Sequence, residues 1–296
     1  MKKLRHLLAL CAALLGAYAA EVETLAKQKI VILGDSITQG GGYVSFTDYY
    51  LQKLRPKLRW EVYGLGLSSE TLSGLSEPGH AGGKFPRPCL FERLGRTLAK
   101  TKPDVVIACY GMNDGIYQPL EDQRFKAFQD GVTKLIEQCQ AAGVKRIVLL
   151  TPPIYDADTK AGEFNYDTVL TAYAAWEMTI KRPGVEVIDL HTTMRKARDA
   201  RSEIFSKDRI HPGDDGHLLM ARTLLAGLGL VTPEMSVATI KADPLFIQAD
   251  NLRKLRAGRW MNHIGYTRER VVAPGPLGTA VEDAAQIQAK MDELRK

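Results

Sequence analysis

Cysteine is scarce in this sequence, which has four among its 296 residues. Cys11 lies in an N-terminal apolar run, where the bulky Leu10 before it argues against lipidation. Cys89, Cys109 and Cys139 are widely spaced and odd in number, so they indicate neither a disulfide framework nor a zinc site. At most one disulfide could form, and we predict none. Histidines and carboxylates show no metal-ligand spacing apart from the residues discussed below, so no metal or cofactor is predicted.

The sequence also lacks clusters of one charge and a second long apolar run. Its formal net charge is +6, and it falls to +3 without residues 1–19, which contain Lys2, Lys3 and Arg5 and no acid. No basic run and no aromatic–basic ladder suggests a nucleic-acid partner. No apolar stretch after the N-terminal one is long enough to span a bilayer, so we predict no stable membrane insertion.

The N-terminus has the features of a secretory signal. Residues 1–5 are basic, residues 7–16 form an apolar run too short to span a bilayer, and residues 17–19 form a small-x-small cleavage site. A buried N-terminal helix is the alternative interpretation, but three cations before the apolar run favour export. We therefore predict that residues 1–19 are a bacterial signal peptide, cut before Ala20, and that the mature protein is periplasmic or secreted.

Short apolar segments alternate with longer amphipathic ones after the signal. The short segments have the length and the Val and Ile content of strands buried on both faces. This alternation predicts an α/β fold, in which helices cover both faces of a parallel sheet of about five strands. Right-handed crossovers place the C-terminal ends of such strands at one edge, where these sheets bind ligands. The predicted strands are 30–33, 60–63, 104–110, 146–151 and 185–190, and the predicted helices are 43–54, 89–100, 124–142, 165–181 and 212–228.

The character of the chain changes at about residue 231. Residues 242–259 and 281–295 have helical patterns and many charges, and the segment 262–278 between them is rich in Gly and Pro. No strand rhythm is visible there. We predict a main domain over residues 20–230 and a helical C-terminal extension, residues 231–296, that packs on it.

Polar residues suited to acyl transfer follow several of the predicted strands. Ser36 follows the first strand, Gly66 the second and Asn113 the third, while Asp208 and His211 come after the fifth. A serine hydroxyl becomes a good nucleophile when a base removes its proton, and His211 is the candidate base. Asp208, three residues earlier, can accept from the other ring nitrogen and fix the tautomer. The N–H groups of Ser36 and Gly66 and the side-chain amide of Asn113 are candidate donors to an oxyanion, and Gly66 has no Cβ to block the approach.

These residues form four sequence blocks, and the chain resembles the SGNH hydrolase superfamily (GDSL-like esterases and lipases) over residues 29–230. The resemblance implies a flavodoxin-like three-layer α/β/α sandwich. It also implies that Ser36 is the nucleophile, that Gly66 and Asn113 complete the oxyanion hole, and that the Asp208–His211 pair activates the serine. Gly64 is a departure, because many members have asparagine there. The blocks are Gly34-Asp35-Ser36, Gly66, Gly111-x-Asn113-Asp114 and Asp208-x-x-His211.

Each of these residues has a structural alternative. Ser36 could be a helix cap, a role that serine often has, although the other three blocks favour catalysis. His217 belongs to a second D-x-x-H pattern, but it falls within the helix that Pro212 is predicted to start, so His211 is the favoured base. Asp35 is predicted to support the turn before Ser36, and Asp114 to have a structural role.

The loop 73–88 follows the second strand and should lie beside the site. Long loops at this edge often form binding surfaces, although a loop rich in Gly and Pro is usually only a connection. Arg87 is a candidate to meet an acidic group of the substrate. Tyr117 and Tyr155 could stack on a sugar, or could simply pack.

The sequence therefore predicts an exported serine esterase for short acyl chains. Exported relatives in the superfamily imply a carbohydrate O-acetylesterase, with an acetylated glycan as the partner. A lipolytic acyl-esterase or lysophospholipase is the alternative, and a carbohydrate-binding pseudoenzyme is a third possibility. No oligomeric state follows from the sequence.

Overall fold

A parallel sheet organises the computed structural model, which describes residues 29–56, 60–157, 163–201 and 205–295. The predicted signal peptide lies outside these residues. The strand order is β2-β1-β3-β4-β5, and every neighbouring pair is parallel. Gly34, at the end of β1, is level with Gly66 on β2 and Cys109 on β3, so these strands end at one edge. The strands are β1 (Lys29–Gly34), β2 (Glu61–Gly66), β3 (Val105–Cys109), β4 (Arg146–Leu150) and β5 (Val185–Ile188).

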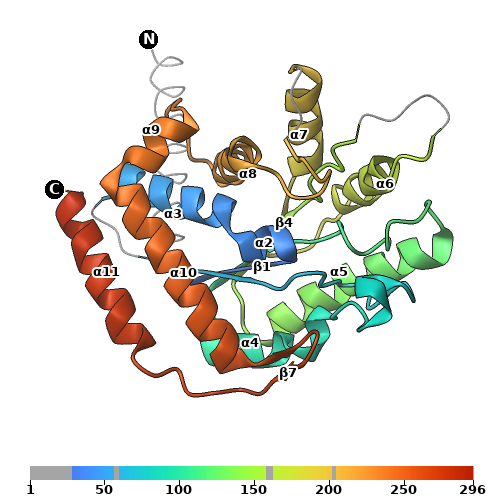
Figure 1. Ribbon diagram of the computed structural model, residues 1–296, viewed down its shortest axis with the longest axis horizontal. Helices are drawn as coiled ribbons and strands as arrows, with labels where there is room; N and C mark the ends of the chain where they lie inside the picture. Colours follow the sequence, from blue (N-terminus) through green and yellow to red (C-terminus); the bar gives the residue numbers. More distant parts are fainter. Residues whose placement is uncertain (1–28, 57–59, 158–162, 202–204, 296) are drawn as a thin grey trace, which may run out of the picture.

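Helices cover both faces of this sheet, which confirms the predicted three-layer α/β/α fold (Figure 1). On one face α3 (Gly42–Leu54) packs against α8 (Asp214–Gly227), and α7 (Leu190–Asp199) packs against α8. The opposite face carries α4 (Leu94–Thr101) and α5 (Asp122–Ala141). The helix α6 (Asp167–Glu177) packs on α5 through the stacked rings of Phe128 and Tyr173, whose centroids are 4.3 Å apart.

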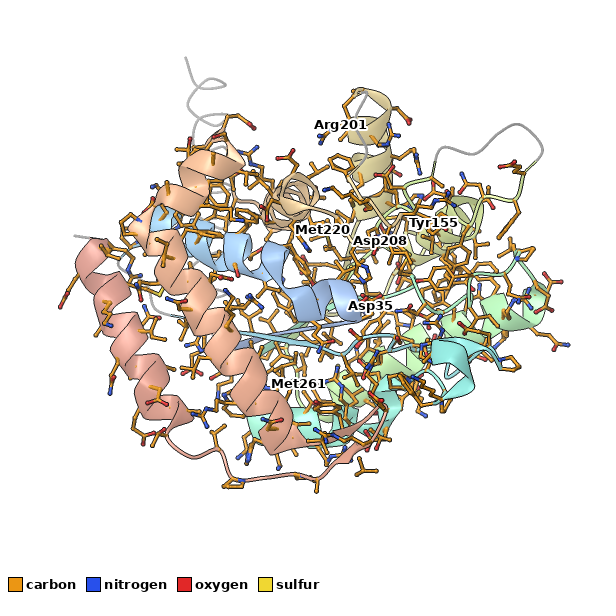
Figure 2. The ribbon with its side chains drawn as sticks, in the orientation of Figure 1. Asp35, Tyr155, Arg201, Asp208, Met220 and Met261 are labelled. Atoms are coloured by element: carbon orange, nitrogen blue, oxygen red, sulfur yellow. The ribbon has the colours of Figure 1, made fainter. Side chains whose placement is uncertain are left out.

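The C-terminal extension covers the free edge of β2. It consists of α9 (Val237–Ala242), α10 (Pro244–Ile264), the short strands β6 (Tyr266–Thr267) and β7 (Val271–Val272), and α11 (Ala280–Leu294). Arg256 of α10 donates to the Val62 carbonyl at 3.2 Å, and Arg93 donates to the Leu65 carbonyl at 2.8 Å. Arg93 also contacts the sulfur of Met261 at 3.6 Å. Figure 2 shows Met261 on α10. The donor from Arg256 thus occupies a carbonyl of the edge strand β2.

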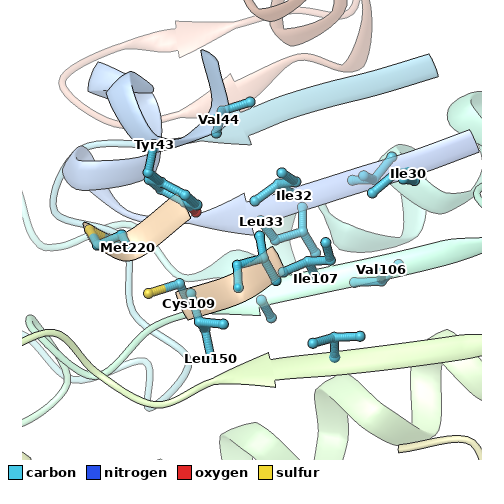
Figure 3. Close-up of a cluster of buried hydrophobic side chains, with 14 of the residues drawn as sticks. Ile30, Ile32, Leu33, Tyr43, Val44, Val106, Ile107, Cys109, Leu150 and Met220 are labelled. Atoms are coloured by element: carbon cyan, nitrogen blue, oxygen red, sulfur yellow. The ribbon is translucent and has the colours of Figure 1, made fainter. Parts of the chain in front are cut away.

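The core lies between the sheet and the helices on each face. Figure 3 shows Ile32 and Leu33 of β1 beside Ile107 of β3, with Tyr43 of α3 and Met220 of α8 over them. These five side chains are almost fully buried, as expected for strands covered on both faces. Of the three described cysteines, which are all free, Cys109 and Cys139 are buried and Cys89 is half-buried.

Several elements differ from the predictions. The helix predicted over 89–100 is divided at Arg93 into a short 3-10 turn, η2 (Leu90–Glu92), and α4, because the Arg93 side chain is drawn into a buried ion pair. The segment 262–278 contains the small β6–β7 hairpin, where no strand was predicted. The helix α7 was also not predicted, although Asp189 caps it by accepting from the Thr192 N–H at 3.0 Å.

Candidate active site

The turn after β1 places Ser36 at the first position of a short helix, α2 (Ser36–Gly40). Asp35 caps this helix, since its carboxylate accepts from the Ile37 N–H at 2.9 Å. The turn leaves little space, because a Cβ on Gly34 would lie 2.0 Å from the Thr38 hydroxyl and 2.8 Å from the Cys109 carbonyl. A tight strand-to-helix turn therefore holds the Ser36 side chain at the edge of the sheet.

His211 and Asp208 reach Ser36 from the loop before α8. The Nε2 atom of His211 lies 2.7 Å from the Ser36 Oγ, and its Nδ1 atom lies 2.6 Å from Asp208 Oδ2. The other carboxylate oxygen of Asp208 accepts from the backbone N–H groups of Ile210 and His211, at 3.0 and 2.8 Å. Because Asp208 accepts the Nδ1 proton, Nε2 is left as the acceptor for the serine proton. The structure thus brings together Ser36, His211 and Asp208 in the order that acyl transfer requires.

The charge on Asp208 is favoured by its surroundings. Partial burial raises the pKa of Asp208, whereas the hydrogen bonds from the His211 ring and from the backbone N–H groups lower it. The hydrogen bonds have the larger combined effect, so the pKa of Asp208 is below its usual value. The His211 and Asp208 side chains are 47% and 56% exposed, so the site is open to solvent. An ionised Asp208 is what stabilisation of a protonated His211 needs.

Gly66, at the end of β2, lies against the backbone of α2. A Cβ at this position would be 2.3 Å from the Gln39 nitrogen and 2.6 Å from the Thr38 carbonyl carbon. Only glycine permits this approach, so the loop after β2 can come close to Ser36. Gly64, the departure from the family pattern, packs beneath the site, where a Cβ would lie 3.2 Å from Val44.

Asn113 is buried beside Asp35 and is held at both ends of its amide. Its Nδ2 donates to Asp35 Oδ2 at 3.2 Å and approaches the Glu70 carbonyl at 3.4 Å. Its Oδ1 accepts from Arg87 Nη1 at 2.8 Å and from the Tyr117 hydroxyl at 3.2 Å. The nitrogen end of the amide thus faces the turn that carries Ser36.

Two buried carboxyls lie close to Asn113. Burial raises the pKa of Asp35 to about 7, with a further rise from the nearby Asp114 carboxyl. Burial also raises the pKa of Asp114 to about 6. Asp114 accepts from the N–H groups of Leu72 and Ser73, both at 2.7 Å, and of Gly111 at 3.0 Å, so it ties the loop after β2 to the loop after β3.

Arg87 reaches the site and is paired with a carboxylate there. Its side chain is only 6% exposed and pairs with Glu77 through two bonds of 2.7 and 2.6 Å. The carboxylate that pairs with Arg87 comes from its own loop, and the expected contact of Arg87 with an acidic group of the substrate stays a prediction. The Tyr117 ring packs against Tyr166 and Tyr155, with centroids 4.8 and 6.3 Å away, and its hydroxyl is engaged by Asn113.

A buried ion pair beneath the site was not found from the sequence. Arg93 bonds both oxygens of Glu70, at 2.7 and 2.6 Å, and the Tyr110 hydroxyl donates to Glu70 at 2.7 Å. Burial raises the pKa of Glu70, and the contact with Arg93 opposes that rise. The two charged residues are 23 positions apart, in segments with no shared periodicity, so no local signal pairs them.

His217 lies in α8, away from the serine hydroxyl. Its ring stacks on Tyr43 with centroids 6.3 Å apart and fills the space beside Gly42. Burial lowers the pKa of His217 to about 4, so the ring is neutral at pH 7. Among the described residues no group of three or more His, Cys, Asp or Glu side chains could hold a metal ion. No helix within the described ranges is both long and apolar enough to cross a membrane.

Comparisons with known proteins agree with this architecture. The acetylxylan esterase Axe2 from Geobacillus stearothermophilus, a catalytic mutant, superposes with a TM-score of 0.53 at 21% identity, covering 70% of this chain and 97% of that one. LAE5, an alpha/beta hydrolase enzyme from the metagenome of Lake Arreo, Spain, gives 0.52 at 23% identity, with the same coverage. At these identities the likeness establishes the fold. No curated protein matches the chain.

Membership of a family rests on a sequence model. The model of the GDSL-like Lipase/Acylhydrolase family matches residues 32–219, which is more than half of the chain and includes every strand-end segment described above. The resemblance of the four sequence blocks is thereby confirmed. This chain belongs to the GDSL-like lipase/acylhydrolase family and is a serine hydrolase of ester bonds.

Proposed function

We propose that this protein is an exported esterase that removes acetyl groups from a carbohydrate, with Ser36 as nucleophile, His211 as general base and Asp208 as its partner. The observation that carries the proposal is the continuous contact from Ser36 Oγ to His211 Nε2 at 2.7 Å and from His211 Nδ1 to Asp208 at 2.6 Å. This is the arrangement that activates a serine hydroxyl.

In the first half of the reaction, Ser36 Oγ attacks the ester carbonyl while its proton passes to His211 Nε2. Asp208 stabilises the imidazolium that forms. The oxyanion accepts from the N–H groups of Ser36 and Gly66 and from Asn113 Nδ2, which exchanges its long contact with the Glu70 carbonyl, 3.4 Å, for the oxyanion and keeps its bond to Asp35. Collapse of the intermediate breaks the bond to the alcohol, which leaves with the proton from His211.

In the second half, His211 takes a proton from water, and the hydroxide attacks the acyl group on Ser36. The same donors stabilise the second oxyanion. Its collapse releases acetate and returns the proton to the Ser36 oxygen.

Two observations favour a short acyl group over a long one. Pro152 fills the space beside Gly111, where a Cβ would lie 2.4 Å from its ring, so the loop after β4 is packed tightly against the loop after β3. The loop 73–88 is fixed by the Glu77–Arg87 ion pair. A long acyl chain needs an apolar channel to offset the cost of ordering it, and neither fixed loop is an apolar lid. The acetylxylan esterases among the structural neighbours support a carbohydrate as the alcohol.

The test is Ser36→Ala, with Ser68→Ala on the neighbouring loop as the matched control. We expect Ser36→Ala to lower kcat by about a thousandfold or more on p-nitrophenyl acetate and acetylated xylan, and Ser68→Ala to keep most of the activity. Wild-type kcat/KM should fall steeply from the acetate to the octanoate ester. Turnover that survives Ser36→Ala would refute the mechanism, and a maximum at octanoate would favour the lipolytic alternative.

A further inference from the structure

The loop 73–88 contains an arginine that bonds the oxygen end of the Asn113 amide. Arg87 Nη1 donates to Asn113 Oδ1 at 2.8 Å, while its Nε and Nη2 bond both oxygens of Glu77. The guanidinium thus bridges the Glu77 carboxylate and the Asn113 amide. It is also held over the Tyr117 ring, with 5.2 Å from Cζ to the ring centroid.

This contact distinguishes the two orientations of the amide. An asparagine side chain can rotate by half a turn and exchange its oxygen and nitrogen, which have nearly the same shape. A guanidinium has only donors, so it accommodates Oδ1 and opposes Nδ2. In the exchanged orientation Nδ2 would face Arg87, and Oδ1 would face the acceptor oxygens of Asp35 and of the Glu70 carbonyl. Both ends would then lose their hydrogen bonds in a buried site.

The loop that carries Arg87 is fixed independently of Asn113. The N–H of Thr71 donates to the Pro88 carbonyl at 2.9 Å, and the N–H of Leu90 donates to the Thr71 carbonyl at 3.0 Å. The Arg87 N–H itself donates to the Ser76 hydroxyl at 2.9 Å. The backbone of Arg87 is therefore held by hydrogen bonds at the base of its loop, and its side chain is held by Glu77. The Arg87 side chain then loses little conformational entropy during the reaction.

We infer that Arg87 is a positioning residue for the oxyanion hole: it holds the Asn113 amide with Nδ2 turned toward Ser36 and polarises it as a donor. Glu77 holds Arg87 in turn, and the Tyr117 hydroxyl assists at Oδ1. This inference rests on the proposed function, because it assumes that Asn113 binds the oxyanion. It gives the loop 73–88 a role in the rate of the chemical step, separate from any contact with substrate.

The experiment measures kcat and KM for Arg87→Met on p-nitrophenyl acetate, in the wild-type and the Asn113→Ala backgrounds. In the wild type we expect kcat to fall about 10- to 100-fold with KM within about twofold, because the oxyanion exists only in the transition state. In the Asn113→Ala background the same substitution should change kcat by less than about twofold, since Arg87 then has no amide to orient. Arg87→Lys, which keeps a cationic donor, should restore part of the loss.

Two further variants distinguish a loss of Asn113 orientation from general damage to the loop 73–88. Arg268→Met is the matched control: Arg268 lies between β6 and β7 and packs against this loop, with its Cζ 5.0 Å from the centroid of the Phe85 ring, and the variant should keep kcat. Tyr117→Phe removes the second donor to Oδ1 and should lower kcat a few-fold in the wild type and not in the Asn113→Ala background. Tyr117→Phe keeps the inference testable if Arg87→Met fails to fold, as judged by its melting temperature.

Each outcome bears on one claim. An unchanged kcat in Arg87→Met, or an equal loss in both backgrounds, would overturn the inference while leaving Ser36 as nucleophile. A normal kcat in Asn113→Ala would remove Asn113 from the oxyanion hole, and the role of Arg87 with it. Only activity that survives Ser36→Ala would overturn the proposed function itself.

Discussion

Five described residues other than glycine have positive φ angles in the segments that carry the site. They are Ser69 at 66°, Ala81 at 53°, Ile116 at 48°, Tyr117 at 56° and Arg209 at 72°. Each costs about 1–2 kcal/mol in this region, most of all the β-branched Ile116. Arg209 separates Asp208 from His211, and Tyr117 directs its hydroxyl to Asn113, so the strained angles lie where they orient the side chains of the site.

Asp35 predicts a pH dependence of stability. Because burial raises its pKa to about 7 from 3.8, the folded protein holds this proton where the unfolded chain has lost it. The free energy of unfolding should therefore decrease as pH rises between these two values. Asp35→Asn keeps a capping oxygen and removes the buried charge. The change that it causes in the free energy of unfolding should therefore be more favourable at pH 8 than at pH 4, by at most about 4 kcal/mol. Denaturant unfolding at both pH values measures this difference.

Asp243 provides the control of opposite sign, because it caps α10 in the same way that Asp35 caps α2. Partial burial raises the pKa of Asp243, but the bonds from Lys53, Leu245 and Tyr49 lower it to below its usual value. Its contribution is present above the unfolded pKa and is lost as pH falls. Asp243→Asn should thus destabilise the protein at pH 8 and have less effect in acid. The same sign for both substitutions would contradict the assignment for Asp35.

The two histidines of the D-x-x-H patterns should separate in a single pair of variants. His211→Ala should lose kcat to about the extent of Ser36→Ala, a thousandfold or more, because the base and the nucleophile act as a unit. His217→Ala should keep most of the activity and lower the melting temperature, because it leaves a cavity beside Tyr43 and Gly42. Steady-state kinetics and a melting curve for both variants test this. If only His217→Ala lost kcat, the assignment of His211 as the general base would be wrong.

At this scale, sequence order alone pointed to Ser36, Asp208 and His211, because motifs at the ends of parallel strands converge on one edge. For Arg87, which was expected to meet an acidic group of the substrate, the ion pair with Glu77 was not predicted. Its partner Glu77 is ten positions away in a loop without periodicity, and no pattern in the sequence indicates that the two side chains meet.

Among the helices, α4 ends in an unfavourable conformation. Lys102, its C-cap, has φ of 47°, and its N–H donates to the Leu98 carbonyl at 2.9 Å. Glycine adopts this left-handed conformation without steric cost. Lys102→Gly should therefore raise the free energy of unfolding by about 0.5–1 kcal/mol, measured by denaturant titration. Lys102→Ala, which keeps a Cβ, is the control and should give no gain. A loss of stability with glycine would mean that the Lys102 side chain contributes more than its backbone costs.

Regular elements were predictable where their periodicity is long and their strands are buried on both faces. The five strands and the helices α3, α5 and α8 were predicted within a few residues. The break at Arg93 was not, because a buried ion pair overrides a continuous helical pattern. The β6–β7 hairpin has two residues per strand, too few for an alternating pattern to appear.

For the whole molecule, the extension predicts a difference between two truncations. A chain that ends at Ala242 loses α10, which buries Phe246 and Leu252 and supplies Arg256 to the edge of β2. We expect this chain to be insoluble or unfolded, because an open sheet edge and an apolar face are exposed together.

A chain that ends at Gly278 is the matched control, since it loses only α11. Within that helix Ala280 and Met291 are the buried residues, so we expect a folded protein with a lower melting temperature. Soluble yield and thermal melting compare the two chains. A stable, cooperative melt for the chain that ends at Ala242 would show that the main domain is independent of the extension.

The exposure of His211 and Asp208 has a consequence for large substrates. A nucleophile at the end of a tunnel can be reached only by the free end of a polymer. Here the proposed general base stands at an open surface, so a long chain can lie across the mouth and present any ester along its length. On a glycan this geometry favours internal attack, in which acetyl groups are removed in no fixed order and the backbone is left intact for the enzymes that cut it.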